Sequence, residues 1–332
     1  MSEFNSKKNL AAKFEEESEK IFQFIEKGLF NKAVLQLDSL MKLDLNYPGL
    51  LTAYRTARFW LNREEKISNL AEGQEMADFL MKEWDLFDKY LAPQDKENSE
   101  AYEKAMRFIF FKASENYKIA FQKHENTTKS FDLLLNLGSC FIKIKEYESA
   151  IKTLEYARSL YSENAFLLSS LAEAYFQAGD LSKSLLYFRE AFFINPSEVD
   201  LNKLKADSIL TLVATIKEEK EKSSYLKEWI PVYAFALDIF YVRRNINKSL
   251  VVNIEKEIYN LEVRYQKMND LDKKNSKILP RLINLYLWMF DYYEFQNYNF
   301  ENIAQIRKRL IELDKSIFFD YFNKLDQKKA IP

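Results

Sequence analysis

Residues 165–198 read AFLLSSLAEAYFQAGDLSKSLLYFREAFFINPSE, and the preceding residues 131–164 read FDLLLNLGSCFIKIKEYESAIKTLEYARSLYSEN. Few residues are identical between the two stretches, but the types of residue correspond when one stretch is shifted by 34 positions. Apolar and small residues keep their places in these pairs: Leu134 and Leu168, Leu137 and Leu171, Gly138 and Ala172, Phe141 and Tyr175, Ala150 and Ser184, Leu154 and Phe188, Ala157 and Ala191. The sequence therefore contains two consecutive copies of one structural unit.

Each copy has the pattern of a helical hairpin. Three apolar residues of the first copy lie three or four positions apart and share one helix face: Leu134, Leu137 and Phe141. Three more follow the same spacing on a second helix: Ala150, Leu154 and Ala157. Gly179 marks the turn of the second copy and Pro196 marks its end. Because one hairpin cannot bury its apolar face alone, neighbouring hairpins are expected to stack.

This pattern resembles the tetratricopeptide repeat, a 34-residue unit with the signature W-x2-L-G-x2-Y…A-x3-F…P. The resemblance implies an all-α fold in which helical hairpins form a superhelix (an α-solenoid), here with an irregular C-terminal half. We expect an N-terminal helical region with degenerate units at 1–125, two clear units at 126–198, and a C-terminal helical region with one degenerate unit at 199–332.

The degenerate copies keep parts of the same spacing. In residues 14–47 the matching positions are Phe24, Gly28, Ala33, Leu37 and Leu40. A second helix just before the clear pair carries Ala113, Tyr117 and Ala120. Near the C-terminus the matching residues are Trp288, Tyr292, Phe295, Ala304 and Ile311, with Asp291 where a leucine is usual. Between the copies we expect a polar connector at 217–224, a helix started or kinked by Pro231, and a long helix within 245–268.

The composition agrees with a helical protein and limits the kinds of partner that we expect. The chain has 332 residues with only five glycines and six prolines, whereas strand-rich folds need frequent turns built from these residues. The net charge is −1, so no overall field favours nucleic acid or an anionic membrane. The 27 phenylalanines and 20 tyrosines follow helical spacing, which favours core packing over base stacking. We therefore expect no nucleic-acid partner.

The sequence also indicates the cellular compartment of the protein. Cys140 is the only cysteine, so the fold does not depend on an oxidising compartment. The first residues lack the apolar run of a secretory signal, and no segment has the run of about 18 apolar residues of a membrane span. These features predict a cytoplasmic protein without direct membrane insertion.

Few residues offer catalytic or metal-binding chemistry. His124 is the only histidine, whereas zinc sites and Ser-His or Cys-His pairs need more such groups close together. His124 is expected near a helix end, and Cys140 is expected to be a small packing residue. The glycines are isolated, so no phosphate-binding loop is predicted. We expect no cofactor, metal or catalytic residue, although a hydrolase that uses only carboxylates remains an alternative.

The resemblance implies a binding surface. In stacked repeats the first helices line the concave face, which usually binds the partner. In the first clear copy this face would contain Asp132, Leu135, Asn136, Ser139, Ile142 and Lys143. In the second copy it would contain Phe166, Ser169, Ser170, Glu173 and Phe176. Some repeat proteins of this kind clamp a terminal carboxylate with Lys and Asn, but here the matching places hold Leu135, Ser139, Phe166 and Ser170.

The mixed apolar and polar character of this face suits an amphipathic helix or an extended segment of a protein partner. The leading hypothesis is therefore a non-enzymatic scaffold or adaptor. The alternatives are a structural subunit of a large assembly, such as a secretion or motility apparatus, and an enzyme on a helical-repeat frame. The sequence does not define the oligomeric state.

Overall fold

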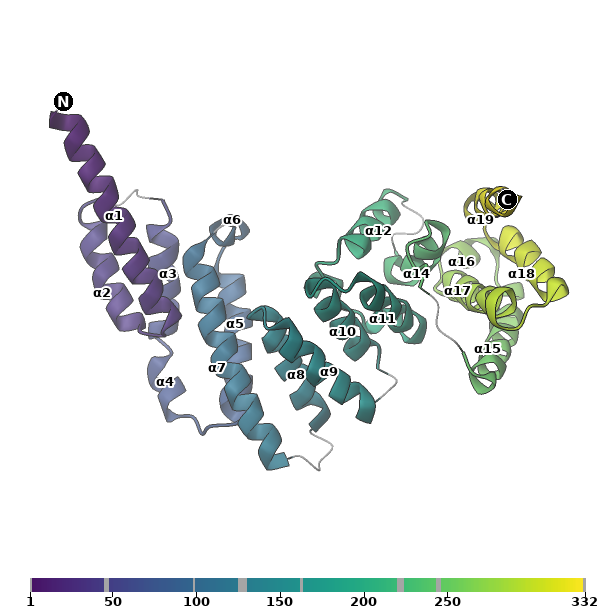
Figure 1. Cartoon of the computed structure of the whole chain (residues 1–332), viewed down its shortest axis with the longest axis horizontal. Helices are drawn as coiled ribbons and strands as arrows, with labels where there is room; N and C mark the ends of the chain where they lie inside the picture. Colours follow the sequence, from purple (N-terminus) through teal and green to yellow (C-terminus); the bar gives the residue numbers. More distant parts are fainter. Residues whose placement is uncertain are drawn as a thin grey trace. The chain divides into compact units, whose positions relative to one another are not determined.

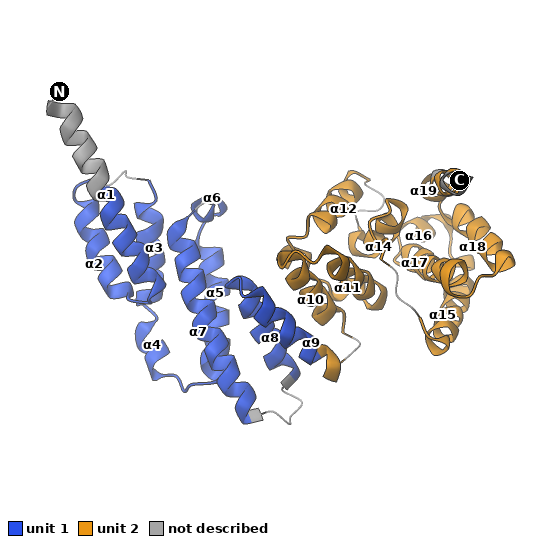
Figure 2. Ribbon diagram, in the orientation of Figure 1, with its two compact units in different colours: residues 1–157 blue, residues 158–332 orange. Residues whose placement is uncertain are grey.

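The computed structural model describes residues 2–44, 48–97, 99–124, 130–161, 164–219, 224–242 and 246–330 (Figure 1). Throughout this part of the chain the regular elements are helices, which confirms the all-α prediction. Helices that are adjacent in sequence largely pack against one another. The chain divides into two compact units, residues 1–157 (unit 1) and residues 158–332 (unit 2), each with its own core (Figure 2).

Unit 1 is organised around one long helix, α7, which packs against α1, α3, α5 and α8. Its helices are α1 (Ser2–Glu26), α2 (Phe30–Met41), α3 (Leu50–Leu61), α4 (Glu64–Asn69), α5 (Gln74–Tyr90), α6 (Pro93–Lys96), α7 (Glu100–His124), α8 (Ser130–Lys143) and α9 (Tyr147–Leu160), whose last residues belong to unit 2. An aromatic cluster forms part of the core, where the Trp60 and Trp84 rings stack with centroids 6.2 Å apart. Phe87 packs against both, at 5.6 and 5.3 Å.

Unit 2 has a second central helix, α17, which contacts α14, α15, α16 and α18. Its helices are α10 (Ala165–Gln177), α11 (Leu181–Ile194), α12 (Asp207–Glu218), α14 (Leu226–Ala236), α15 (Lys248–Gln266), α16 (Asp270–Lys274), α17 (Ile278–Asp291), α18 (Phe300–Leu313) and α19 (Lys315–Ala330). Short helical turns lie at Pro196–Glu198, Leu201–Lys203 and, with a π-helical geometry, Tyr292–Gln296. Several helices of this unit have a side-chain cap at their N-terminus. The Asn164 side chain accepts a hydrogen bond from a backbone N–H group of α10, and the Asp180 side chain accepts one from α11.

Three hairpins end their first helix in the same way. The turn residues Gly28, Lys145 and Gly179 have left-handed backbone with φ of 69°, 65° and 86°. In each turn, the backbone N–H of the residue that follows the left-handed residue donates a hydrogen bond to the carbonyl five residues before it. The bonds run from Leu29 to Phe24, from Glu146 to Phe141 and from Asp180 to Tyr175, at 2.8–2.9 Å. This bond is the signature of a Schellman motif. Lys145 and Gly179 are 34 residues apart, so the turn geometry follows the sequence period.

The helices predicted in residues 131–198 are present as α8, α9, α10 and α11. The predicted long helix is α15, and Pro231 lies inside α14. Residues 220–223 of the expected polar connector lie outside the described residues. The boundary between the compact units falls near the end of the first clear copy, within the last turn of α9, and the predicted division by repeat content stays a prediction.

The C-terminal copy is a helical hairpin with a different register from the predicted one. Ala304 is exposed, and Phe295 is 53% exposed on the π-helical turn. The apolar face of α18 is instead formed by Ile303, Ile306, Leu310 and Leu313. Because these residues follow the three- and four-residue spacing of an amphipathic helix, they bury a face that excludes Ala304.

A buried ion pair explains why an aspartate stands where a leucine was expected. Asp291, at the end of α17, accepts a hydrogen bond from Arg189 of α11, and both side chains are almost fully buried. Arg189 also donates to the Val242 carbonyl at 3.1 Å and lies 5.0 Å from the Trp288 ring centroid. The pair links the second clear copy to the central helix of unit 2.

Gly138→Leu should destabilise the protein by about 1–3 kcal/mol, the usual cost of overpacking. Even a Cβ atom at Gly138 would lie 2.5 Å from Cδ2 of the buried Leu154, so α8 and α9 would have to separate. Urea denaturation followed by circular dichroism measures the effect, with Ser139→Leu on the half-buried neighbouring position as control. Adding Leu154→Ala should recover part of the loss. Equal stability of Gly138→Leu and the wild type would contradict the proposed helix contact.

Asp291→Asn should lower the free energy of unfolding by about 3–5 kcal/mol, because it leaves the Arg189 charge buried without its carboxylate. The double variant Arg189→Met/Asp291→Leu should lose less free energy of unfolding than Asp291→Asn does, since it removes both charges together. Asp270→Asn is the control, because the Asp270 side chain is 98% exposed. A double variant less stable than Asp291→Asn would show that the pair itself is strongly favourable.

Candidate functional site

The residues predicted on α8 differ in exposure. Asp132 and Lys143 are exposed, whereas Leu135 is buried, with 7% of its surface exposed. The other three are half-buried: Asn136, Ser139 and Ile142. All six belong to unit 1, so α8 presents a partly accessible polar and apolar face within that unit.

The residues predicted on α10 belong to unit 2, and two of them are buried. Ser169 and Glu173 are only 2% and 3% exposed. The remaining three are half-buried: Phe166, Ser170 and Phe176. Because the predicted face is divided between the two units, the prediction that α8 and α10 form one groove stays a prediction.

The Glu173 carboxylate is engaged inside unit 2. It accepts hydrogen bonds from the backbone N–H groups of Lys205 and Ala206 at 2.9 and 3.3 Å. The Gln177 side chain donates to it at 2.7 Å. Next to it, the Lys203 ammonium lies 5.4 Å from the Phe166 ring centroid. Residues 203–206 therefore lie against this face of α10, and Glu173 holds the segment that leads into α12.

A separate hollow surface follows α7 in unit 1. One hollow, of about 350 Å³, is lined by Glu103, Lys104, Met106, Arg107, Lys143, Ile144, Lys145 and Glu146. The adjoining hollow, of about 320 Å³, is lined by Glu26, Arg107, Phe108, Phe111, Ile144 and Glu146. Three residues line both hollows: Arg107, Ile144 and Glu146. We call the two hollows together the α7 groove; of the predicted site residues, Lys143 lines it.

Helix spacing and two turns shape the α7 groove. Lys104, Arg107 and Phe111 share one face of α7 because they are three and four residues apart. Phe108 is fixed at the wall by the α1–α2 turn, where a Cβ atom on Gly28 would lie 2.1 Å from the ring. The Phe108 ring also meets Phe30 edge-on at 5.6 Å. The turn between α8 and α9 supplies the opposite wall.

The α7 groove combines apolar surface with charge. Phe111 is 52% exposed, and Met106 and Ile144 are half-buried. Glu26 of α1 pairs with Lys104 at 3.0 Å and more distantly with Arg107 at 3.4 Å. Four basic and three acidic side chains line the two hollows in total. The groove is therefore an apolar strip with a slightly basic rim.

Unit 2 contains a larger cavity, of about 820 Å³, where several helix ends converge. It is lined by Glu219, Trp229, Tyr265, Asp270, Lys273, Lys274, Leu279, Leu313, Asp314, Lys315 and Ser316. Its carboxylates have internal partners: Tyr233 donates to Glu219, Lys273 pairs with Asp270 at 3.5 Å, and Asp314 accepts from the Ser316 hydroxyl at 2.6 Å. Each of these carboxylates thus has a contact within unit 2.

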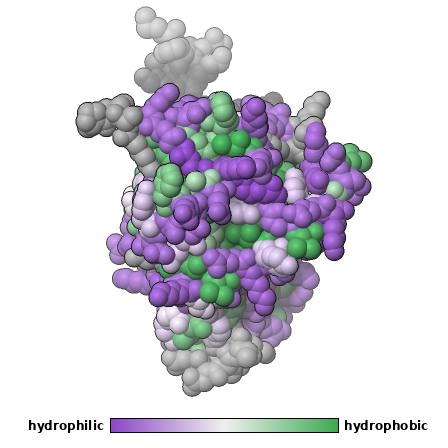
Figure 3. Space-filling view, turned by 90° about the vertical axis from the view of Figure 1, so that its right-hand side faces the viewer, coloured by the Kyte–Doolittle hydropathy of each residue, from purple (hydrophilic) through white to green (hydrophobic). Residues whose placement is uncertain are grey.

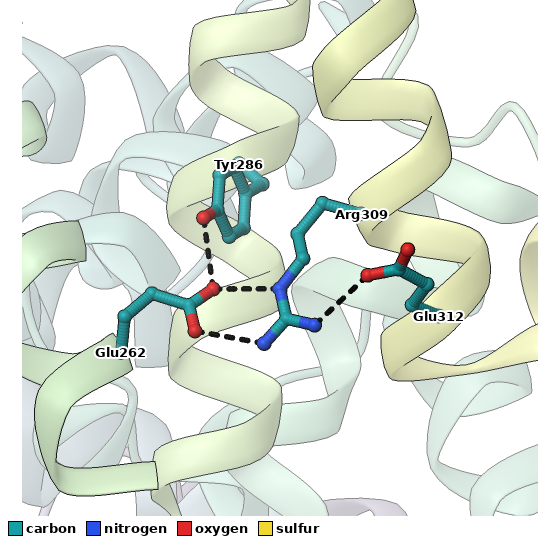
Figure 4. Close-up of polar contacts among 4 residues, drawn as sticks. All are labelled: Glu262, Tyr286, Arg309 and Glu312. Carbon is teal, nitrogen blue, oxygen red and sulfur yellow. Dashed lines mark hydrogen bonds and ion pairs between the residues drawn. The ribbon is translucent and has the colours of Figure 1, made fainter. Parts of the chain in front are cut away.

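A charged cluster joins α15, α17 and α18 (Figure 4). The Arg309 guanidinium donates two hydrogen bonds to the Glu262 carboxylate, at 2.8 and 2.7 Å, and a third to Glu312 at 3.1 Å. The Tyr286 hydroxyl donates to Glu262 at 2.8 Å. Burial and this hydrogen bond raise the pKa of Tyr286, and the bond to Glu262 raises the pKa of Arg309. Both groups keep their protons, so the cluster holds the three helices together.

Of the cysteine and the histidine considered as reactive groups, the structure describes the side chain of Cys140 alone. The Cys140 thiol is buried on α8 with its Sγ 3.8 Å from the Met81 sulfur, and burial raises its pKa. A thiol in such surroundings is a poor nucleophile. His124 is the last residue of α7, and its side chain lies outside the described residues.

The described residues contain neither a cluster of metal ligands nor a membrane-spanning helix. No three or more His, Cys, Asp or Glu side chains there are grouped as metal ligands would be. Among the helices in the described ranges, none has the length and apolar character needed to cross a bilayer.

Comparison with known families leaves the family undefined. No family model matches this sequence. The resemblance to tetratricopeptide repeats thus rests on the residue pattern, and what is established is an all-helical chain of consecutive packed helices.

The outer surface carries apolar side chains of two kinds, exposed on a loop or lining a hollow. Figure 3 shows one face of the chain as mainly hydrophilic, with apolar side chains in separate patches. In unit 2, the connection from the π-helical turn into α18 exposes Phe295, Tyr298 and Phe300 by 53%, 69% and 70%. The α7 groove differs from this exposed loop because its apolar residues line a hollow and have charged groups around them.

Glu173→Gln should destabilise the protein by about 1.5–3 kcal/mol, since hydrogen bonds to a charged group are replaced by weaker ones. Hydrogen exchange at Lys205 and Ala206 should accelerate, because their amides lose their carboxylate acceptor. Asp132→Asn, on the exposed end of α8, is the control and should leave both quantities unchanged. Unchanged exchange in Glu173→Gln would contradict the structural role of this carboxylate.

Proposed function

We propose that this chain is a non-enzymatic protein-interaction scaffold or adaptor in the cytoplasm, built as a tetratricopeptide-like superhelix of stacked hairpins. The observation that supports the proposal is the α7 groove. Its half-exposed Phe111 lines one hollow with Ile144 and charged side chains, and Met106 lines the adjoining hollow. Large apolar side chains exposed within a polar rim mark interaction sites on protein surfaces.

The turn geometry supports the repeat architecture within this proposal. Gly28, Lys145 and Gly179 end their helices with the same left-handed conformation and the same backbone hydrogen bond. A hairpin that recurs with constant turn geometry presents its first helix in the same way each time, as solenoid repeats do. The predicted face on α8 also has accessible groups: Lys143, which lines the α7 groove, and Asp132, which is exposed outside its lining.

The two alternatives would use these features differently. A structural subunit of a large assembly would keep the α7 groove permanently covered by another subunit. An enzyme would need reactive groups that converge on a substrate; the cavity of unit 2 holds three carboxylates, but each has an internal contact. The scaffold hypothesis is therefore preferred over the enzyme hypothesis.

Affinity purification of the tagged full chain from its native cells, with quantitative mass spectrometry, tests the proposal. The variants are Phe111→Lys in the α7 groove and, as a matched control, Leu35→Lys at a position on α2 that is 61% exposed. Wild type and Leu35→Lys should retain the same partners. Phe111→Lys should retain them roughly thirtyfold less well, since loss of a central apolar anchor typically costs about 2 kcal/mol.

The stoichiometry of the recovered proteins separates the hypotheses. A few partners in fixed stoichiometry would favour a structural subunit, and varied substoichiometric partners would favour an adaptor. Recovery of no specific partner by the wild type would contradict both. Partners that bind wild type and Phe111→Lys equally would place the binding surface elsewhere, for example on the predicted face of α8.

A further inference from the structure

We infer that the α7 groove binds an amphipathic helix of a partner protein, in which an acidic residue lies between two apolar anchors about one turn apart. This inference rests on the proposed scaffold function and specifies the partner's chemistry. It depends on three features of unit 1: the two adjoining hollows, the position of Arg107, and the unusual turn at Lys145.

The paired hollows match two anchors of a helix. Met106 lines one hollow and Phe111 lines the other, five residues further along α7. Five residues correspond to a rise of about 7.5 Å along α7 and to a rotation of about 140° around it, so Met106 and Phe111 lie on different sides of the helix. The hollows adjoin through Arg107, Ile144 and Glu146, which line both, and two anchors one turn apart on a bound helix would enter neighbouring hollows. Each anchor would bury apolar surface against one hollow.

The composition of the groove favours a helix over an extended segment. Extended ligands obtain much of their affinity from main-chain hydrogen bonds to an exposed strand edge. The floor of the α7 groove consists of helical side chains, whose backbone groups are already bonded within α7. A bound helix satisfies its own backbone, so it needs only side-chain contacts from this surface.

Arg107 supplies the specificity for an acidic residue. It lines both hollows, its side chain is 67% exposed, and among the described residues it has a 3.4 Å ion pair with Glu26. Glu26 is held more closely by Lys104, at 3.0 Å. The guanidinium has five N–H donors in a planar fork, which can bind an incoming carboxylate in a bidentate manner. A carboxylate between the two apolar anchors would lie at this position.

The turn opposite Arg107 adds a second argument for an acidic ligand. Lys145 has a φ of 65°, in the region where a side chain costs roughly 1 kcal/mol. The corresponding turns at Gly28 and Gly179 use glycine, which has no such cost. The chain therefore places a lysine at the rim of the groove where glycine would be more stable. Residues in unfavourable backbone conformations often serve binding, and here the gain is a positive charge.

The test uses the full chain and a displayed library of single-helix peptides on a fixed polar background. Two positions one turn apart and one position between them are randomised. Selection should enrich apolar residues at the outer positions and Asp or Glu at the middle position. The most enriched peptide, labelled with fluorescein, is then titrated with each protein variant by fluorescence anisotropy, and melting temperatures verify folding.

Arg107→Glu should weaken binding of the selected peptide at least tenfold. A peptide with Lys in place of its middle acidic residue should bind Arg107→Glu more tightly than it binds the wild type. Lys145→Gly should weaken binding of the acidic peptide severalfold and raise the melting temperature of the protein. The matched control is Arg58→Glu, an exposed position on α3 outside the groove, which should change peptide affinity less than twofold.

Three outcomes would overturn the inference: no enrichment, enrichment of basic residues at the middle position, or equal binding to wild type and Arg107→Glu. A concentration-dependent self-association that Arg107→Glu abolishes would identify a second copy of the chain as the occupant instead. The scaffold proposal is separable from these results. If Phe111→Lys loses the native partners while no acidic helix is selected, the scaffold function stands and the inference fails.

Discussion

The packing of this chain follows from the limited apolar surface that two amphipathic helices can bury between themselves. A hairpin such as α8 and α9 covers one face of each helix and leaves the other for a neighbour. In unit 1 the additional surface comes from α7, and in unit 2 it comes from α17. Close approach needs small residues, as Gly138 shows against Leu154. The two central helices, α7 and α17, thus pack against helices that would be marginal alone.

Polar contacts between distant positions then fix how the helices of unit 2 are arranged. Arg189 and Asp291 are far apart in sequence and meet in the core, and Glu173 binds the backbone of the segment before α12. Each of these groups is buried, so each would be costly without its partner. We infer that the Arg189–Asp291 pair contributes to specificity for one arrangement of helices more than to stability.

The sequence predicts the local elements well and the long-range contacts poorly. The hairpins of residues 131–198 and the turn at Gly179 follow from helical periodicity and from the conformational freedom of glycine. Asp291 stood out as an exception to the repeat pattern, but periodicity cannot identify Arg189 as its partner. Similarly, Glu173 was predicted on a binding face, although its carboxylate holds Lys205 and Ala206. In the C-terminal copy, weak similarity gave an incorrect register at Ala304.

The α7 groove could not be found from the repeat pattern, because its lining residues come from the end of α1, from α7, from the end of α8 and from the α8–α9 turn. Only Lys143 belongs to both the predicted face and the groove. The most direct measurement is site-specific photo-crosslinking in the native cells, with a photoreactive amino acid at Phe111 or, for comparison, at Leu35. If the α7 groove is the binding surface, position 111 should give a discrete crosslinked protein and position 35 should give none. Absence of any product at 111, or identical products at both positions, would contradict binding in the groove.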